Sequence, residues 1–415
     1  MKKFTTGLFA FSLIILVFVL IMMTGINNGF AQDKQPVQSK NYGGVQLEYP
    51  DGDYIPSSRE DHPRSPAYQY FSSGFSVVQV NVDENGDNIV NDAANEPSIS
   101  FNAENPDEIV IGWRQFDNIN NSFRQAGYGY STDAGQTWTF PGVLDPGVFR
   151  SDPVLRCDGQ GNIYYNTLTS QNDQYWTNTY KSVDGGATWE MGTFAQGGDK
   201  QWIAVDRSSG IGGGNIYEMW NYAYSICPPD NFTRSTDGNE SYESCSKIPG
   251  DPYWGTSFVS PNGELYVCGA QWGGFIVGKS STAQDPSEMI SWDWTVSVNL
   301  GGEIIGLPGD NYPNPVGLLG QTIIAMDSSG GPGHGNIYLL CSVDRFITSD
   351  PCDVMFARST DGGLTWSTPV RINDDLNNYS FQWFGTMSVA PDGRIDVVWL
   401  DDRESFSSFH SALYY

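Results

Sequence analysis

The segment STDAGQTW at residues 131–138 returns as SVDGGATW at 182–189 and as STDGGLTW at 359–366. A degraded copy, STDGNESY, stands at 235–242. The copies that begin at residues 131, 182 and 235 are 51 and 53 residues apart, which is the length of a four-stranded propeller blade rather than of a helical or leucine-rich repeat. The period therefore predicts an all-β propeller.

Each copy has the composition of a tight turn, because Asp and Ser side chains bond nearby backbone amides, Gly takes a positive φ, and Trp packs back between neighbouring sheets. The copies resemble the Asp-box, or bacterial neuraminidase repeat, family, in which S-x-D-x-G-x-T-W joins the third and fourth strands of a blade. The resemblance implies a sialidase-like propeller, although such turns also occur in non-enzymatic propellers. The residues expected to hold these turns are Ser131, Asp133, Gly135, Trp138, Ser182, Asp184, Gly186, Trp189, Ser235, Asp237, Ser359, Asp361, Gly363 and Trp366.

Six units of this kind predict a six-bladed β-propeller of four-stranded antiparallel blades over residues 73–415. The sixth unit stops after its third strand, at residues 410–415. We therefore expect a truncated last blade and an incomplete ring, with the alternating stretch 75–82 as a candidate outer strand for that blade. An open sheet edge is an aggregation hazard.

Residues 1–31 have the features of a signal peptide: Lys2 and Lys3, an apolar run at 8–23, and a small-x-small cleavage site at 29–31. An uncleaved anchor is the alternative, since the run is long for a signal core and short for a membrane span. Residues 32–72 are polar and aperiodic, as in an extended lead. We expect a secreted, periplasmic or cell-surface monomer that is not stably inserted in a membrane after cleavage.

The formal net charge is −27, so the surface repels phosphate backbones, and nucleic acid is not an expected partner. Six cysteines fit an oxidising compartment. The candidate disulfides are Cys227/Cys245 and Cys341/Cys352, whereas Cys157 and Cys268 are expected to be buried thiols. Three histidines, spread along the chain, do not favour a histidine-ligated metal or a Ser-His-Asp triad.

The segment NVDENGDN at 81–88 places Asp83, Asn85 and Asp87 as alternate oxygen ligands around a glycine. This spacing is compatible with a calcium loop, but the twelve-residue pattern with its terminal Glu is absent. A solvated turn is the alternative interpretation. We expect no other cofactor.

The alternation of strands places the starts of first strands and the ends of second strands on the face opposite the box turns. The first-strand starts carry one acid per blade: Glu96, Asp152, Asp199 and Asp251. Trp202, Trp254 and Trp383 lie near the same face, where indole rings either stack on sugars or pack the blades together. These residues are candidates for substrate binding, and turn capping by the acids is the structural alternative.

The second-strand ends carry Arg114, Arg345 and Arg403 in units that neighbour one another in a closed ring. Converging guanidinium groups suit a carboxylate ligand, and this set resembles the arginine triad with which sialidases hold sialic acid. The alternative is that each arginine pairs with a neighbouring acid, namely Asp117, Asp344, Asp401 or Asp402. The early Arg-Ile-Pro motif of the family is missing; the nearest string, FRSDP at 149–153, lacks the Ile.

The resemblance further implies a Tyr nucleophile activated by a Glu, with an Asp as acid/base. By position, the candidates are Asp117 or Asp152 as acid/base, and Tyr222 or Tyr253 paired with Glu218. The leading hypothesis is a glycoside hydrolase of exo-α-sialidase type acting on a glycan or glycoconjugate. The alternatives are a non-catalytic glycan- or protein-binding propeller, which scattered, salt-bridged arginines would favour, and a glycosidase that uses paired carboxylates on neutral glycans.

Overall fold

The computed structural model describes residues 53–72, 74–172, 174–306, 313–314, 317–376, 378–404 and 410–415. The signal peptide predicted at 1–31 and the first part of the predicted lead lie outside these residues. Within the described ranges, no helix is both long enough and apolar enough to cross a membrane.

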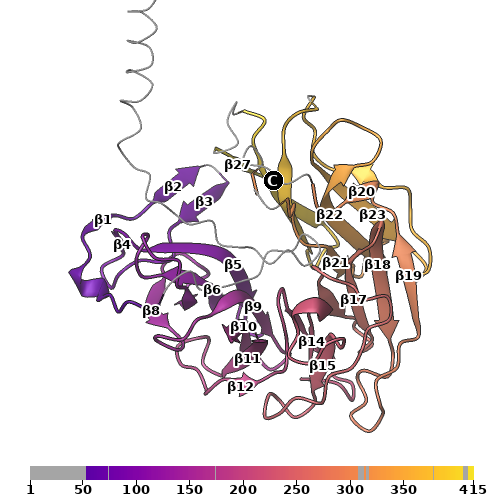
Figure 1. Ribbon diagram of the computed structural model, residues 1–415, viewed down its shortest axis with the longest axis horizontal. Helices are drawn as coiled ribbons and strands as arrows, with labels where there is room; N and C mark the ends of the chain where they lie inside the picture. The colour runs from indigo at the N-terminus through magenta and orange to yellow at the C-terminus, as the bar shows by residue number, and fades with distance from the viewer. Residues whose placement is uncertain are drawn as a thin grey trace, which may run out of the picture. The chain divides into compact units, whose positions relative to one another are not determined.

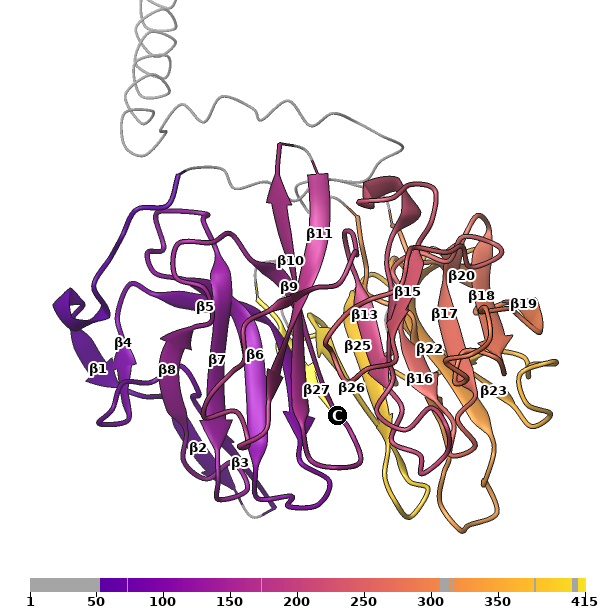
Figure 2. The same cartoon turned by 90° about the horizontal axis from the view of Figure 1, so that it is seen from below.

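Antiparallel sheets of a six-bladed propeller make up the chain, as predicted (Figures 1 and 2). The first strand of each blade packs against the first strand of the next, from β5 through β9, β13, β16 and β21 to β25. Within the described residues, no comparable packing joins β25 to β5. Among the described strands, the series of packed first strands therefore ends at β25.

The strands of the blades follow chain order. Blade one is β5 (Ala93–Phe101), β6 (Ile109–Phe116), β7 (Gln125–Ser131) and β8 (Thr139–Val143), and blade two is β9 (Ser151–Cys157), β10 (Ile163–Gln171), β11 (Gln174–Ser182) and β12 (Thr193–Phe194). Blade three is β13 (Trp202–Val205), β14 (Ile216–Met219) and β15 (Phe232–Ser235), and blade four is β16 (Ser257–Val259), β17 (Leu265–Gln271), β18 (Gly274–Ser280) and β19 (Trp294–Val298). Blade five is β21 (Ile323–Met326), β22 (Ile337–Arg345), β23 (Asp353–Ser359) and β24 (Val370–Arg371), with β20 (Gly302–Glu303) beside the end of β22, and blade six is β25 (Gln382–Val389), β26 (Ile395–Asp401) and β27 (Ala412–Tyr414).

Short elements precede the blades: η1 (Arg59–Asp61), and the strand pairs β1 (Arg64–Pro66) with β4 (Asp87–Ile89) and β2 (Gln69–Ser72) with β3 (Phe75–Val78). The prediction that residues 75–82 complete the sixth blade is wrong, because β3 forms a hairpin with β2. Beyond β3, Val80 packs beside Trp113 and Phe140 of blade one. The N-terminal elements therefore cover the outer part of blade one.

The four repeated turns share one hydrogen-bond pattern. In the first, Ser131 Oγ donates to Asp133 Oδ1 over 2.7 Å and accepts from the Gly135 amide over 2.9 Å, while Asp133 also accepts from the Thr137 amide over 2.9 Å. The Ser and Asp bonds recur at Ser182, Ser235 and Ser359, so the turn mechanism predicted from the sequence is confirmed.

The aromatic residue that ends a repeated turn also packs between neighbouring blades. Trp189 meets Tyr128 of blade one and Tyr165 of blade two edge-on, with ring centroids 5.6 and 5.9 Å apart. Gly186 has φ 90°, and a Cβ there would lie 2.4 Å from Val110 of blade one. Glycine is therefore required both by the backbone and by the close approach of the turn to the neighbouring blade.

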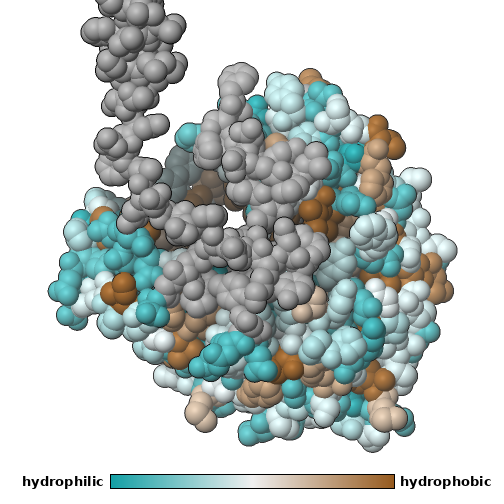
Figure 3. All heavy atoms as spheres, viewed as in Figure 1, coloured by the Kyte–Doolittle hydropathy of each residue, from teal (hydrophilic) through white to brown (hydrophobic). Residues whose placement is uncertain are grey.

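On the face seen in Figure 3, hydrophilic and hydrophobic residues alternate in small groups.

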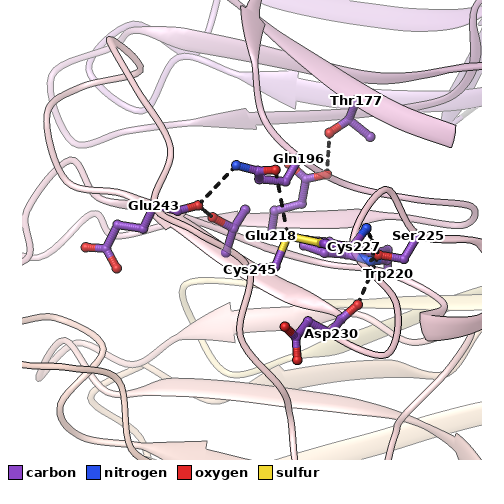
Figure 4. Close-up of a disulfide and its surroundings, with 10 residues drawn as sticks. Thr177, Gln196, Glu218, Trp220, Ser225, Cys227, Asp230, Glu243 and Cys245 are labelled. Carbon is purple, nitrogen blue, oxygen red and sulfur yellow. Dashed lines mark hydrogen bonds between the residues drawn. A yellow bond between two sulfur atoms is a disulfide. The ribbon is translucent and has the colours of Figure 1, made fainter. Parts of the chain in front are cut away.

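Cys227 and Cys245 form a disulfide, as predicted (Figure 4). The predicted bond between Cys341 and Cys352 is absent, and both are buried thiols. The strand register explains the difference, because Cys341 lies opposite Met355, three residues along the chain from Cys352. The remaining two cysteines, Cys157 and Cys268, are buried thiols as predicted.

Candidate functional site

The first strands of blades one and two carry a bulge where the predicted acids lie, and in blade three a turn at 199–200 precedes the first strand. Glu96 and Asp152 have φ 50° and Lys200 has φ 53°, a left-handed conformation that few residues other than glycine adopt. The ladder slips between Asn95 and Ser98 and again opposite Asp152. A bulge leaves its extra residue outside the ladder and redirects its side chain, so Glu96 and Asp152 can meet the side chain of Lys200 from the turn.

Lys200 lies at the centre of the resulting group. Its Nζ is 3.1 Å from Asp152 Oδ1 and 3.8 Å from Glu96 Oε1, and its backbone amide donates to Asp152 Oδ2 over 3.2 Å. Arg114 Nη2 lies 3.0 Å from the same Glu96 oxygen. Asp199, the residue before Lys200, is buried, and its Oδ1 has no hydrogen-bond partner in the described part of the chain. We call Glu96, Arg114, Asp152, Asp199 and Lys200 the acid–lysine cluster.

The carboxyl groups of Glu96 and Asp152 share a hydrogen bond, and their pKa values move in opposite directions. Burial raises the pKa of Glu96, as do the charge of Asp152 and the shared hydrogen bond, against Lys200 and Arg114. Burial also opposes the charge of Asp152, but Lys200, Arg114 and the hydrogen bonds outweigh it and lower its pKa. Glu96 is therefore the more readily protonated member of the pair, and Asp152 the more readily ionised one. Glu96 is also the accessible member, with 39% of its side chain exposed against 5% for Asp152.

Four residues of this cluster were predicted, and Lys200 was not. The sequence comparison placed Asp199 in register with Glu96 and Asp152, but the residue of blade three that shares their left-handed conformation is Lys200. Asp199 stands one position earlier, where burial and the charge of Asp152 raise its pKa. The sequence pattern does not single out Lys200, because Gln201 follows it whereas Pro97 and Pro153 follow Glu96 and Asp152.

Arg114, Arg345 and Arg403, the predicted arginine triad, are each paired with an acid. Arg114 pairs with Glu96, Arg345 Nη1 lies 2.5 Å from Asp353 Oδ2, and Arg403 Nε donates to Asp401 Oδ2 over 2.8 Å. Each arginine is thus tied to an acid of its own blade. Only the Asp401 partner was among those predicted.

Arg345 and Arg403 are linked by a buried network. Asn373 Nδ2 donates to Asp353 Oδ1 over 2.7 Å and to Asp375 Oδ1 over 2.6 Å, and Asp375 lies 3.9 Å from Arg403 Nη2. The network joins blades five and six, and its arginine charges are matched by buried carboxylates.

Asp117 lies apart from the acid–lysine cluster. It accepts a hydrogen bond from Gln125 Nε2 over 2.7 Å. Burial raises its pKa, and the bond from Gln125 and the charges of Arg59 and His62 oppose that shift. Of the two acid/base candidates, only Asp152 belongs to the cluster.

Glu218 is fully buried and accepts hydrogen bonds from Asn166 over 2.9 Å and from Thr177 over 2.6 Å (Figure 4 shows the Thr177 bond). Burial raises its pKa to about 8. The acid whose charge raises the pKa of Tyr253 is Glu303 rather than Glu218.

The two tyrosine candidates lie near each other on different elements. Tyr222 belongs to η2 (Tyr222–Tyr224). Burial raises the pKa of Tyr253, and the neighbouring Glu303 and Tyr222 act in the same direction. A phenol nucleophile needs a lowered pKa or an adjacent base, and the shift here is the opposite.

The other predicted substrate contacts are structural. Trp254 and Trp383 are buried, and Trp202 packs in the core beneath the Arg156 guanidinium, 4.6 Å from its ring centroid. Asp251 Oδ1 pairs with Lys247 Nζ over 3.1 Å.

The calcium candidates form a capped turn. Asp83 Oδ1 accepts from the amides of Asn85 and Asp87 over 2.9 and 3.0 Å, and Asp83 Oδ2 accepts from Arg64 Nε over 2.7 Å. Because these bonds occupy both Asp83 oxygens, the solvated-turn alternative is favoured. Among the described residues, no group of three His, Cys, Asp or Glu side chains is arranged to hold a metal ion.

No family model and no curated protein matches this chain. Solved structures do. The K499G mutant of NanB sialidase from Streptococcus pneumoniae aligns with a TM-score of 0.50 and 11% identity over 86% of this chain and 71% of that chain. The intramolecular trans-sialidase from Ruminococcus gnavus, in complex with oseltamivir carboxylate, has a TM-score of 0.49 and 11% identity over 78% of this chain and 92% of its own. The α-L-arabinanase of Penicillium chrysogenum, complexed with arabinobiose, has a TM-score of 0.43 and 13% identity over 74% and 88%. The likeness is one of fold.

Proposed function

We propose that this protein is a glycoside hydrolase that cleaves glycosidic bonds at the acid–lysine cluster, with Glu96 as the proton donor. The observation that carries the proposal is the Glu96–Asp152 pair, whose pKa values are driven apart around Lys200. Pairs of carboxyl groups with opposed shifts are the means by which one site supplies both an acid and a carboxylate near neutral pH.

In the proposed reaction, the glycosidic C–O bond breaks while Glu96 gives its proton to the leaving oxygen. Asp152 stays ionised and stabilises the positive charge that develops at the anomeric carbon. Water adds its oxygen to that carbon, and the proton that it releases returns to Glu96. Lys200 and Arg114 hold the two carboxyl groups in place through contacts of 3.0 to 3.8 Å.

We propose a neutral sugar as the substrate. A sialoside would need cationic groups for its carboxylate, and Arg345 and Arg403 are engaged with Asp353 and Asp401. The likeness to a sialidase and an arabinanase concerns the fold that would carry such a site. The choice of a neutral sugar as substrate depends on the charge argument alone.

A second candidate is a non-catalytic glycan- or protein-binding propeller. The observation in its favour is the pairing of each predicted arginine with an acid of its own blade. In that case the acid–lysine cluster would hold the first strands of blades one to three together.

The test is hydrolysis of a panel of fluorogenic glycosides: an α-sialoside, an α-L-arabinofuranoside, and neutral α- and β-hexosides. The variants are Glu96→Gln and Asp152→Asn, with the exposed Glu104→Gln as the matched control. We expect cleavage of a neutral glycoside and a loss of about 10²- to 10⁴-fold in kcat/KM for Glu96→Gln, the range for removal of a general acid, with Glu104→Gln unchanged.

A folded parent that cleaves nothing would support the binding propeller. Cleavage of the α-sialoside that collapses in Arg403→Ala but persists in Glu96→Gln would contradict the assigned site and restore the sialidase mechanism.

A further inference from the structure

A cavity lies at the outer edge of blade one, between the N-terminal elements and the first repeated turn, at residues 131–138. It has a volume of 880 Å³, which is within the range of ligand pockets. None of its lining residues belongs to the acid–lysine cluster. We call it the blade-one cleft, and the residues that matter for its chemistry are Arg59, Glu60, Glu84, Gln136, Trp138 and Phe140.

One wall of the cleft is the aromatic residue of the first box. Trp138 Nε1 donates to the Gly135 carbonyl over 3.0 Å, so the polar atom of the indole is satisfied within the turn. The ring is partly exposed and lines the cleft. A flat apolar ring with its polar edge already bonded is suited to stacking.

The lining next to this wall contains a cation with an unused donor. The Arg59 guanidinium lies 3.8 Å from the Phe140 ring centroid and donates to the Phe140 carbonyl over 3.3 and 3.4 Å. Its Nε is buried and has no partner within the described residues.

The rim of the cleft is polar and mostly acidic, with Glu60, Glu84 and Gln136 all exposed. Carboxylate and amide groups bond vicinal hydroxyls, and the three acids of the lining, Glu60, Asp83 and Glu84, outnumber its two arginines, Arg59 and Arg64. The net charge of −27 opposes anionic ligands further. An indole wall, planar polar groups and repulsion of anions together match an uncharged, hydroxyl-rich ring.

We propose that the blade-one cleft binds a neutral glycan chain, as a site separate from the acid–lysine cluster. It would hold a polymer on the propeller whether or not the protein cleaves it. Trp138 then serves two purposes, because it closes the turn and forms the sugar-stacking wall.

The test is calorimetric binding of neutral arabino-, xylo- and gluco-oligosaccharides, with oligogalacturonate as the anionic probe. All variants carry Glu96→Gln, and the recovered ligand is checked for integrity, so binding is measured apart from hydrolysis. Trp138→Ala is compared with Trp366→Ala, because Trp366 Nε1 makes the same 3.0 Å bond to Gly363 in the equivalent turn of blade five. The pair therefore shares the structural cost of losing a box tryptophan.

We expect a neutral oligosaccharide to bind, with affinity at least tenfold weaker in Trp138→Ala and within twofold of the parent in Trp366→Ala. If Trp138→Ala does not fold, the exposed pair Glu60→Ala/Glu84→Ala replaces it, with an expected weakening of about fivefold. Binding that neither change weakens, or no neutral oligosaccharide bound by the folded parent, would overturn the proposal. So would salt-sensitive binding of oligolysine that the glutamate pair abolishes, since it would assign the cleft to a cationic peptide.

Discussion

Glu218 should make the protein less stable as the pH rises, and Glu218→Gln should remove that dependence. The carboxyl group is fully buried, and the residues bonded to it are Asn166 and Thr177, neither of which is charged. Burial raises its pKa from 4.5 to about 8. In the folded protein the group is therefore protonated at neutral pH, whereas in the unfolded chain it is ionised.

The magnitude follows from proton linkage. Between pH 5 and pH 8 the unfolded chain has released a proton that the folded protein still binds, so the free energy of unfolding falls as the pH rises. With one pKa unit worth about 1.4 kcal/mol, the shift to about 8 gives a loss of about 3 kcal/mol across this window. The contribution is fully present below pH 4.5 and is exhausted above the folded pKa of about 8. Gln keeps the shape and stays neutral, and the Thr177 hydroxyl can turn to accept from its amide.

The assay is urea unfolding followed by tryptophan fluorescence at pH 5, 6, 7 and 8, for the parent, Glu218→Gln and the exposed control Glu104→Gln. We expect the difference in unfolding free energy between Glu218→Gln and the parent to grow by about 3 kcal/mol from pH 5 to pH 8. Glu104→Gln should run parallel to the parent. Parallel lines for Glu218→Gln and the parent would refute the reasoning, since they would mean that Glu218 is ionised in the folded state.

Two further predictions concern the acid–lysine cluster and the disulfide. Lys200→Met removes the cation that keeps the pKa of Asp152 low, so the acid limb of the pH–rate profile should move to higher pH. Lys200→Arg keeps the charge and should leave the acid limb near the parent position. An unmoved acid limb in Lys200→Met would contradict the role assigned to Lys200. Cys227→Ser/Cys245→Ser opens a crosslink between residues 18 apart. Chain entropy gives a loss of about 3 kcal/mol in unfolding free energy, measurable as a lower urea midpoint. Replacing the buried thiols Cys157 and Cys268 by serine should change the urea midpoint equally with and without reductant.

The fold was predictable because the box turns are local. Each turn closes through bonds between residues two to four positions apart, such as Ser131 to Asp133 and Asp133 to Thr137, so its signature survives in the sequence. The blade spacing then follows from the distances between the signatures. The Cys341/Cys352 prediction failed for the opposite reason, since the outcome depends on the register of β22 against β23, which the spacing of the two cysteines does not specify.

The site was predictable only in part, because its geometry depends on bulges. Alignment of the unit openings places Asp199 with Asp152, whereas the bulges of blades one and two and the turn before β13 bring Glu96, Asp152 and Lys200 together. The resulting group sets Lys200 and Arg114 against Glu96, Asp152 and Asp199, a combination that neither the acids at the first-strand starts nor the arginine triad predicted. The same backbone conformation recurs at Trp254 and Phe384, with φ 49° and 53°, where the side chains are apolar. The left-handed conformation thus recurs from blade to blade, also at Asp251 with φ 50°, and the ion pairs among Glu96, Asp152 and Lys200, rather than the conformation itself, distinguish the candidate site.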